Sequence, residues 1–387
     1  MFELLFLLLP VAAAYGYYMG KASSRQRRDA VSNTRAHNYI RGVEYFLNNE
    51  RERAVDRFIA YFNESDPSFE THVALGNLFR KRGEMDKAIS MHEALLSNAR
   101  LSDPEHEVAQ LELARDFIAA GLLDRAEQNL THLVDIPRQR AEAASLLVQV
   151  YERERDYPEA IRVALKYQES MGRRLTVPLS HYYCEVAAAH ALSSEGESEG
   201  DLYRKALSVN PSSLRARLGL CEVALRAGQN EEAFKLIKEV SALNPDTGLI
   251  CLEYLLKIFP NKADPKLRFA LDDLVRRTRS AAAMVELVET VEQSSGRDDA
   301  EVMLLSFVKE KPNLKLFSEL MRLRSREEDQ SASDAILQLK SLVDAQIASN
   351  YRYSCHRCGF QSRLLFWQCP SCRRWDTLKP IRGLDGD

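Results

Sequence analysis

Four cysteines near the C-terminal end have a spacing that specifies chemistry. Cys355 and Cys358 form one C-x2-C pair, and Cys369 and Cys372 form a second pair after ten intervening residues. In each pair a tight turn directs two sulfur atoms at one ion, and the backbone N–H groups of the turn stabilise the thiolate charge. Two such turns complete a tetrahedron. The spacing therefore predicts one metal ion bound by Cys355, Cys358, Cys369 and Cys372.

The favoured metal is zinc, and a rubredoxin-type iron is the alternative, because tetrahedral coordination by four sulfurs suits both metals. A closed shell of four thiolates leaves no open position for a substrate, so we expect a structural metal. Disulfide bonds are a further alternative that depends on the redox state of the compartment. Gly359 follows the first pair, where a turn often requires a positive φ angle. His356 lies inside that pair, but four cysteines already complete the shell.

Enzyme motifs are absent from the sequence. It contains no phosphate-binding loop of the G-x-x-x-x-G-K-[ST] type, no G-x-S-x-G elbow and no H-E-x-x-H helix. We therefore predict that the protein is not an enzyme and has no catalytic residues. Thiol redox chemistry at the C-x2-C pairs is a minor alternative. The other three cysteines, Cys184, Cys221 and Cys251, are expected to be small packed side chains.

The N-terminal segment is long enough to cross a membrane once. Residues 2–20 are apolar apart from Glu3, and a helix of this length spans about 30 Å. Basic residues follow this segment at Lys21, Arg25, Arg27 and Arg28, and none precedes it. The positive-inside rule then predicts an uncleaved anchor with the body of the protein in the cytoplasm, where thiols stay reduced. A cleaved signal sequence is the alternative, because residues 12–14 resemble a small-residue cleavage site.

Composition limits the remaining functions. The chain has 387 residues, of which 28% are charged, and a net charge of −3, so it has no general bias toward nucleic acid. The C-terminal segment from Tyr351 to Asp387 differs, because seven basic residues there outnumber three acidic ones. A nucleic-acid-binding zinc ribbon that uses Trp375 or Phe366 for stacking is therefore one alternative function.

A helical repeat occupies the middle of the chain. Alanines that open the second helix of each unit recur at Ala54, Ala88, Ala126, Ala160, Ala233 and Ala300, with spacings of 34, 38, 34, 73 and 67 residues. Periods near 34, single or doubled, indicate tetratricopeptide repeats, in which each unit is a helical hairpin. We count about eight units, beginning near Arg35, with the unit near residues 248–280 degenerate. A last amphipathic helix leads into the cysteine module, and residues 324–333 are a candidate hinge or an exposed helix end.

The sequence thus predicts an all-α fold, a tetratricopeptide-repeat superhelix with an N-terminal transmembrane helix and a small C-terminal rubredoxin-like four-cysteine zinc module. The expected divisions are an anchor at 1–20, a basic juxtamembrane segment at 21–34, the array at 35–323, a hinge and connecting helix at 324–350, and the metal module at 351–387. Stacked repeats expose a concave surface that ordinarily binds a peptide or a partner helix. Its candidate residues are Asn77, Arg80, Arg115, Gln149, Glu152, His181 and Glu185. A solvated polar face without a partner is the alternative for each.

The order of these parts resembles the lipopolysaccharide assembly protein B family. The residues that carry the resemblance are Tyr353, Cys355, Cys358, Gly359, Phe360, Trp367, Cys369, Pro370, Cys372 and Trp375, and it extends over the whole chain. Arg373 departs from the glycine that usually follows the second pair in rubredoxins, which argues against iron more than against the family.

The resemblance implies a regulatory adaptor, anchored by a single pass in the bacterial inner membrane. Members of the family help a membrane-bound ATP-dependent protease to degrade the deacetylase that commits precursor to lipid A, and they gather other lipopolysaccharide enzymes at the membrane. The metal module would dock against the array as a rigid element. A scaffold that assembles these enzymes without proteolytic output is the alternative within the same pathway. Binding of nucleic acid is the less favoured reading.

Overall fold

The computed structural model describes residues 68–97, 101–190, 198–326 and 330–387, together with residues 17–21 and isolated positions between 40 and 61. The chain divides into two compact units. Unit 1 comprises residues 1–156 and 165–171, and unit 2 comprises residues 157–164 and 172–387. Most of the anchor predicted at residues 2–20 lies outside the described residues. Among the residues described, no helix has both the length and the apolar character to span a bilayer.

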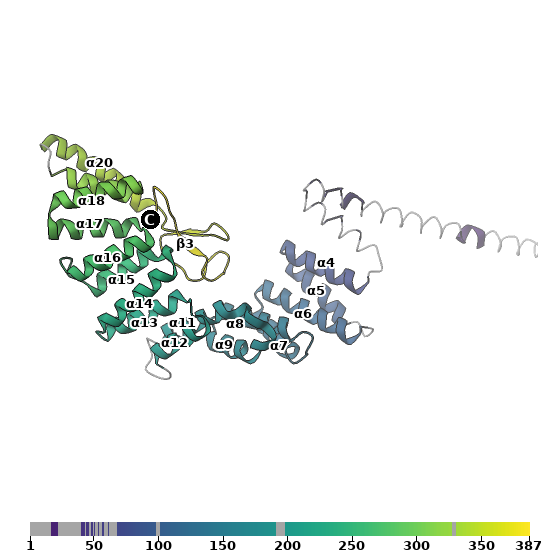
Figure 1. The fold of residues 1–387 in the computed structure, drawn as a ribbon. Coiled ribbons are helices and arrows are strands. Elements are labelled where there is room, and N and C mark those ends of the chain that lie inside the picture. The colour runs from purple at the N-terminus through teal and green to yellow at the C-terminus, as the bar shows by residue number, and fades with distance from the viewer. Residues whose placement is uncertain are drawn as a thin grey trace, which may run out of the picture. The chain divides into compact units, whose positions relative to one another are not determined.

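Both units are built from antiparallel helices joined by short turns (Figure 1). The helices of unit 1 are α4 (Phe69–Arg82), α5 (Met85–Leu96), α6 (Asp103–Ala120), α7 (Leu123–Leu133), α8 (Arg140–Glu154) and α10 (Gln168–Met171). Helix α9 (Tyr157–Lys166) begins in unit 2. Each of these hairpins has the two-helix form that the repeat period predicts.

Unit 2 continues the same pattern as far as residue 349. Its helices are α11 (Thr176–His190), α12 (Glu199–Val209), α13 (Leu214–Arg226), α14 (Asn230–Leu243), α15 (Gly248–Ile258), α16 (Pro265–Thr278), α17 (Ala281–Ser295), α18 (Arg297–Glu310), α19 (Leu314–Arg324) and α20 (Gln330–Ser349). Two short 3-10 turns, η1 (Gly172–Leu175) and η2 (Pro245–Thr247), lie before α11 and α15. The fold is therefore mostly helical, as predicted.

In four of the described hairpins, the turn contains a residue in the left-handed conformation. Gly83 (φ 83°), Gly121 (φ 79°) and Gly228 (φ 72°) occupy this position after α4, α6 and α13, and Arg155 (φ 62°) occupies it after α8. A glycine takes this conformation without a steric penalty, which is why the turns are mostly glycine. The second helix then begins two residues further on.

The alanines that define the repeat lie where the helices approach most closely. Ala88, Ala126, Ala160, Ala233 and Ala300 are all completely buried, and each is the fourth residue of its helix. Ala54 lies outside the described residues. Gly219 on α13 also allows a close approach between helices, because a Cβ atom there would lie 2.3 Å from the Tyr203 ring. The predicted repeat register is confirmed at these five alanines.

The last helix, α20, packs against α19. The Ser318 hydroxyl on α19 donates a hydrogen bond to Asp344 on α20 (2.5 Å), and Lys340 forms an ion pair with the same carboxylate. A continuous hydrophobic core runs from Leu218 on α13 to Leu323 on α19, with Trp367 of the metal module packed against it. Residues 327–329, in the candidate hinge, lie outside the described residues.

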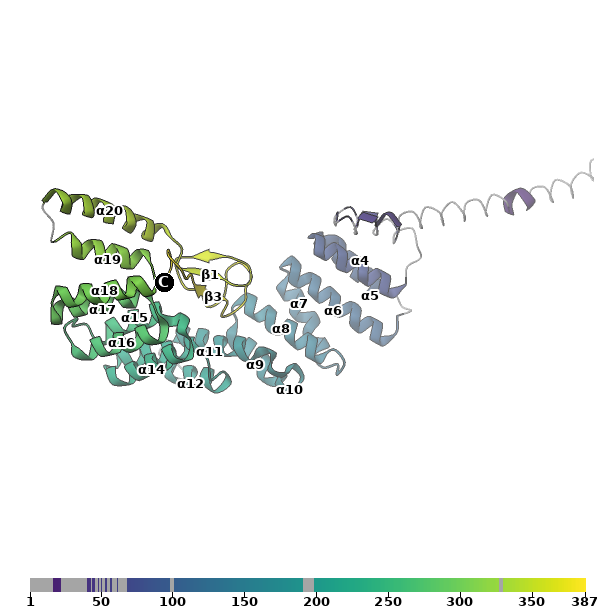
Figure 2. The same ribbon diagram turned by 45° about the horizontal axis from the view of Figure 1, so that its top comes forward.

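A three-stranded antiparallel sheet forms the C-terminal module. Its strands are β1 (Tyr353–Cys355), β2 (Gln361–Ser362) and β3 (Leu378–Pro380), in the order β2-β1-β3. Tyr353 pairs with Ser362 on one side and with Pro380 on the other. In both views the strands lie beside the helices of unit 2 (Figures 1 and 2).

Candidate metal centre and its docking surface

Two backbone turns of the same design hold the four cysteines. In the first, Cys355 N–H donates to Phe360 O (2.8 Å) and Gly359 N–H donates to Cys355 O (2.9 Å). In the second, Cys369 N–H donates to Arg374 O (2.9 Å) and Arg373 N–H donates to Cys369 O (2.8 Å). The matching hydrogen bonds make the two turns equivalent, so that each presents two sulfur atoms to the space between them.

The residue after each pair has a positive φ angle. Gly359 has a φ of 77°, as the sequence predicts, and Arg373 has a φ of 55° at the equivalent position. A non-glycine residue in this region is uncommon and costs some free energy. Arg373 thus departs from the usual glycine in sequence but keeps the backbone conformation that the turn requires.

The sulfur atoms are spaced for one tetrahedral ion. Cys355 Sγ lies 3.8 Å from Cys372 Sγ, and Cys358 Sγ lies 3.6 Å from Cys369 Sγ. All four atoms lie within 4.8 Å of one another. A tetrahedron with metal–sulfur bonds of about 2.3 Å has edges of about 3.8 Å, whereas a disulfide requires about 2.05 Å. The four thiols are free, and their arrangement fits a metal ion rather than two disulfides.

Hydrogen bonds around the sulfurs favour the thiolate form at two of them. Burial alone would raise the pKa of Cys355, but hydrogen bonds from Thr377 and from the N–H groups of Arg357 and Cys358 lower it to about 6. The Phe360 N–H group lowers the pKa of Cys358. Burial raises the pKa of Cys369 to about 12, so a cation is needed to hold that sulfur as a thiolate.

The remaining candidate ligands are occupied elsewhere. His356 Nδ1 lies 2.8 Å from Thr377 O, in a hydrogen bond that joins the first turn to the chain before β3. Cys184, Cys221 and Cys251 are completely buried in the array, as predicted. Burial raises the pKa of Cys184 and Cys221 to about 12 and that of Cys251 to about 11, which keeps them as thiols. The metal site is therefore a four-cysteine rubredoxin-like site.

The module is docked on helix α11 through an aromatic and ionic contact. The His181 ring is stacked on the Trp375 ring, with 4.5 Å between centroids, and Tyr182 contacts Trp375 edge-on at 6.1 Å. His181 Nε2 also lies 2.9 Å from Asp376 Oδ1. Trp375 and Asp376 directly follow the second cysteine turn. This contact consequently ties the position of the metal site to the array.

A second contact lies beneath strand β3. Arg382 donates to Thr278 O (3.0 Å), to Pro245 O (2.9 Å) and to Asp246 Oδ1 (2.9 Å). Lys379 adds a weaker ion pair with Asp246 at 3.7 Å. These partners lie in η2, which three helices separate from α11, and at the end of α16, which is further along the array. The module therefore joins repeats that are not neighbours in the array.

The C-terminal tail, residues 381–387, makes the third contact. Asn313 Nδ2 donates to Gly383 O (2.9 Å) and Gly386 O (3.2 Å). The Asp387 side chain accepts a hydrogen bond from Ala282 N–H at the start of α17 (3.0 Å) and lies 3.2 Å from Lys315 Nζ. A Cβ atom on Gly386 would lie 2.0 Å from Ile381 O, so this close turn requires glycine.

Three of the predicted groove residues lie in a charged network of unit 1. Arg80 forms ion pairs with Glu112 and with Asp116, both at 2.6 Å, and donates to Asn77. The Asp116 carboxylate is completely buried and also contacts His92 Nδ1 at 2.5 Å. Arg115 pairs with Glu112 and with Glu142. Asn77, Arg80 and Arg115 thus come together, and the two arginines are paired with acidic side chains of α6 and α8.

The other predicted groove residues are not gathered at one point. Gln149 is exposed on α8 and Glu152 is half-buried on the same helix. Glu185 on α11 pairs with Arg215 on α13 at 2.8 Å. His181 is 1% exposed because the metal module covers it. Sequence reasoning missed Asp376, Arg382 and Asp387 as docking residues, and the only signal for them was the excess of charge in the C-terminal segment.

Comparisons with known proteins agree with this geometry. A family model described as "Rubredoxin metal binding domain" matches residues 353–380, and tetratricopeptide-repeat models match residues 71–107 and 201–250. Lipopolysaccharide assembly protein B of Escherichia coli K12 is 35% identical over 389 residues, which cover 100% of both chains. The Haemophilus influenzae protein of the same name is 34% identical and covers 98% of each chain. This chain therefore belongs to the lipopolysaccharide assembly protein B family.

Proposed function

We propose that this chain is a regulatory adaptor of lipopolysaccharide biosynthesis at the bacterial inner membrane. In this proposal it promotes degradation of the lipid A-committing deacetylase by a membrane-bound ATP-dependent protease. The array and the docked module provide binding surfaces, and no step of the reaction is carried out by the chain itself. The family models that match it describe repeats and a metal-binding module, neither of which is a catalytic domain.

The main support for the proposal is the fixed position of the metal module on the array. The chain is also similar over its full length to lipopolysaccharide assembly protein B. Three separate contacts, at His181, at Asp246 and at Asn313, hold it. Repeats in an open array contact only their neighbours. A module that joins distant repeats supports the presentation of a partner in one orientation, which an adaptor between two proteins requires.

Zinc is the metal that we propose for the four cysteines, with iron as the alternative. When bound, the metal supplies the cross-link that holds the two turns together, because so small a sheet has little apolar core. The four cysteines would hold the ion, and the backbone N–H groups near Cys355 and Cys358 would stabilise their charge.

The membrane anchor belongs to the proposal as well. Residues 2–20 would cross the inner membrane once, with the body in the cytoplasm. The segment boundaries at 20, 34, 323 and 350 would separate the anchor, the basic juxtamembrane segment, the array, the hinge with its connecting helix, and the metal module. A tether raises the effective concentration of the array near a membrane-bound protease, so modest affinities suffice. A form that starts at Ser32 should then fail to regulate at native expression levels.

Two other functions remain as alternatives. A scaffold would position other lipopolysaccharide enzymes without changing the lifetime of the deacetylase. A nucleic-acid binder would use the basic module, but the Trp375 ring is stacked on His181 and is unavailable to a base in this docked state. Phe366, which is 38% exposed, is the aromatic residue that such a function would retain.

One experiment separates the adaptor from the scaffold. The half-life of the deacetylase is measured after synthesis is blocked, in cells that lack this protein and in cells complemented with the full chain or the Ser32 form. The adaptor predicts a short half-life only with the full chain. An equal half-life in all three strains, together with misplaced lipopolysaccharide enzymes, would favour the scaffold.

A further inference from the structure

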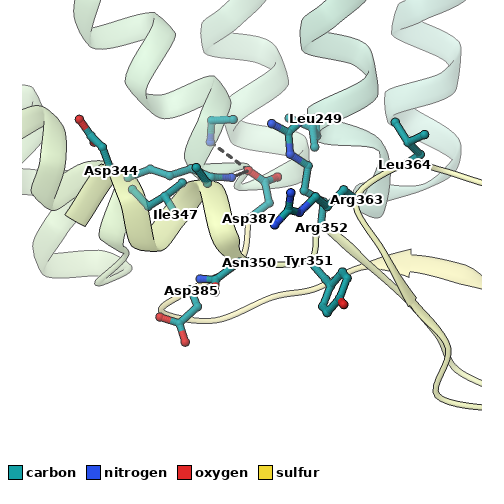
Figure 3. Close-up of a pocket in the computed structure, with 14 residues that line it drawn as sticks. Leu249, Asp344, Ile347, Asn350, Tyr351, Arg352, Arg363, Leu364, Asp385 and Asp387 are labelled. Carbon is teal, nitrogen blue, oxygen red and sulfur yellow. Dashed lines mark hydrogen bonds and ion pairs between the residues drawn. The ribbon is translucent and has the colours of Figure 1, made fainter. Parts of the chain in front are cut away.

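A cavity of about 630 Å³ lies between the end of α20, the start of β1 and the C-terminal tail (Figure 3). Its volume falls in the range of small-molecule sites in proteins. It lies beside the docking contacts described above but includes none of the four cysteines. It is therefore separate from the metal site, and none of the predicted groove residues lines it.

Two arginines from adjacent strands line this cavity. Tyr353 pairs with Ser362 across the sheet, and Arg352 and Arg363 are the next residues at that end of the two strands. The Arg352 N–H donates to Ser362 O at 3.0 Å, which confirms that the two strand ends lie together. Two like charges on adjacent strands repel each other unless an anion lies between them.

No acidic group forms an ion pair with either arginine within the described part of the chain. Arg363 donates instead to the carbonyl oxygen of Ser349 (3.0 Å). The cavity does contain acidic residues, but Asp387 is engaged by Lys315 and Asp344 by Lys340. Asp385 is exposed and lies beyond ion-pair distance of both arginines.

Apolar side chains form another part of the wall. Leu249 and Ile347 line the cavity from the array and from α20, and Leu364 follows Arg363 directly. Leu364 is 68% exposed and Tyr351 is 51% exposed, so both side chains offer apolar surface to a ligand that enters the cavity. The cavity thus combines two arginines that form no ion pair with an apolar surface at their side.

We propose that this cavity binds a phosphorylated amphiphile, with its phosphate monoester between Arg352 and Arg363 and its apolar part against Leu364. A dianionic phosphate neutralises both arginines at once, whereas a carboxylate supplies a single charge. Arginine binds phosphate through two parallel N–H donors, which gives the pair its geometric fit. This inference does not depend on the proposed adaptor function, because purified protein is sufficient to test it.

The test uses the full-length, metal-loaded protein with an N-terminal tag in an uncharged maltoside detergent. Binding of hexyl phosphate, inorganic phosphate and hexanoate is measured by titration calorimetry. We expect hexyl phosphate to bind most tightly, and Arg352→Gln or Arg363→Gln to weaken it at least about tenfold, since each removes charged hydrogen bonds. Leu364→Ser should weaken hexyl phosphate severalfold and leave inorganic phosphate unchanged.

Arg374→Gln is the matched control, because Arg374 is an exposed arginine of the same module outside the cavity. Its affinity for hexyl phosphate should equal that of the wild type, and metal content should be the same in all variants. Absence of hexyl phosphate binding, or an equal loss with Arg374→Gln, would overturn the proposed site. Equally tight binding of hexanoate would overturn the phosphate assignment, and equally tight inorganic phosphate would overturn the apolar part.

Discussion

The imidazole of His181 on α11 is stacked on the indole of Trp375 in the metal module, with 14° between the ring planes. His181 was expected to face an open groove, and its surface is instead covered by a part of the same chain. The neighbouring contact between His181 and Asp376 adds a polar component to the stack. These two residues therefore report whether the module is docked.

The first prediction is a measurable coupling between these two rings. His181→Ala and Trp375→Ala should each weaken docking, and the double variant should lose about 0.5–1.5 kcal/mol less than the sum of the single losses. Amide hydrogen exchange in β1 measures the free energy of module opening. Combining His181→Ala with Arg374→Gln, whose side chain is exposed, should give additive effects. Additivity of the His181 and Trp375 effects would show that the stack contributes no energy of its own.

The second prediction concerns the C-terminal tail. Gly386→Ala should release the tail from Asn313, because the added Cβ would meet the Ile381 carbonyl oxygen at 2.0 Å. Amide exchange at the start of α17 should then accelerate, since Ala282 N–H loses its acceptor. Asp385→Ala, an exposed change in the same tail, is the control and should leave that exchange rate unchanged. Unaltered exchange in Gly386→Ala would refute the predicted clamp.

The third prediction is a pH dependence of the same contact. Burial alone would raise the pKa of Asp387, but Lys315, Ala282 N–H and Ser280 together hold it below its ordinary value of 3.8. A carboxyl group with a lowered pKa stabilises the folded state above its ordinary pKa, and this contribution is lost as the pH falls further. Protection of the α17 amides should therefore exceed that of Asp387→Asn at pH 5 and 6. This difference in protection should shrink below about pH 4. A difference that does not change with pH would contradict the assignment of the effect to the Asp387 carboxyl group.

The fourth prediction distinguishes two classes of thiol. The chain has seven cysteines, of which four form the metal site and three are buried with a raised pKa. A disulfide reagent should modify four thiols after a chelator removes the metal from folded protein, and all seven only in denaturant. Replacing Cys369 with Ser should release the metal, whereas Cys184→Ser should retain it. Reaction of more than four thiols in the folded, chelated protein would contradict this division.

The fifth prediction concerns the charged network of unit 1. Arg80→Ala leaves the buried Asp116 carboxylate with His92 but without its arginine partner, which should cost about 3–5 kcal/mol. Denaturant unfolding monitored by exchange of the α6 amides measures this loss. Gln149→Ala is the control, because an exposed change of this kind stays within about 0.5 kcal/mol. A small effect of Arg80→Ala would show that its ion pair with Asp116 contributes little to stability, which would favour a role of Arg80 in binding a partner.

Local features of the fold could be predicted from the sequence because they depend on nearby residues. The five alanines are buried since each repeat needs a small side chain where its two helices cross, and this need recurs with the repeat period. The four cysteines and the positive φ angle of Gly359 follow from the geometry of a short turn. Arg373 shows the limit of such reasoning, because its backbone keeps a conformation that its side chain disfavours.

The docking surface could not be predicted in this way. Arg382 binds the Thr278 carbonyl from 104 residues away, and Asp387 binds Ala282 N–H from 105 residues away. No periodic pattern links residues at such separations, and the backbone groups that make these contacts have no sequence signature. His181 was identified as a groove residue from its repeat register, but its stacking on Trp375 depends on how the module is oriented.

We propose that the metal module must be docked on the array for regulation of the deacetylase. The most direct measurement is the deacetylase half-life in cells whose only copy of this protein carries His181→Ala and Trp375→Ala. The purified double variant should retain its metal, and Arg374→Gln should behave as the wild type. If docking is required, the double variant should lengthen the half-life toward that of cells lacking the protein. A half-life as short as in wild-type cells, with the module shown to be undocked, would contradict it.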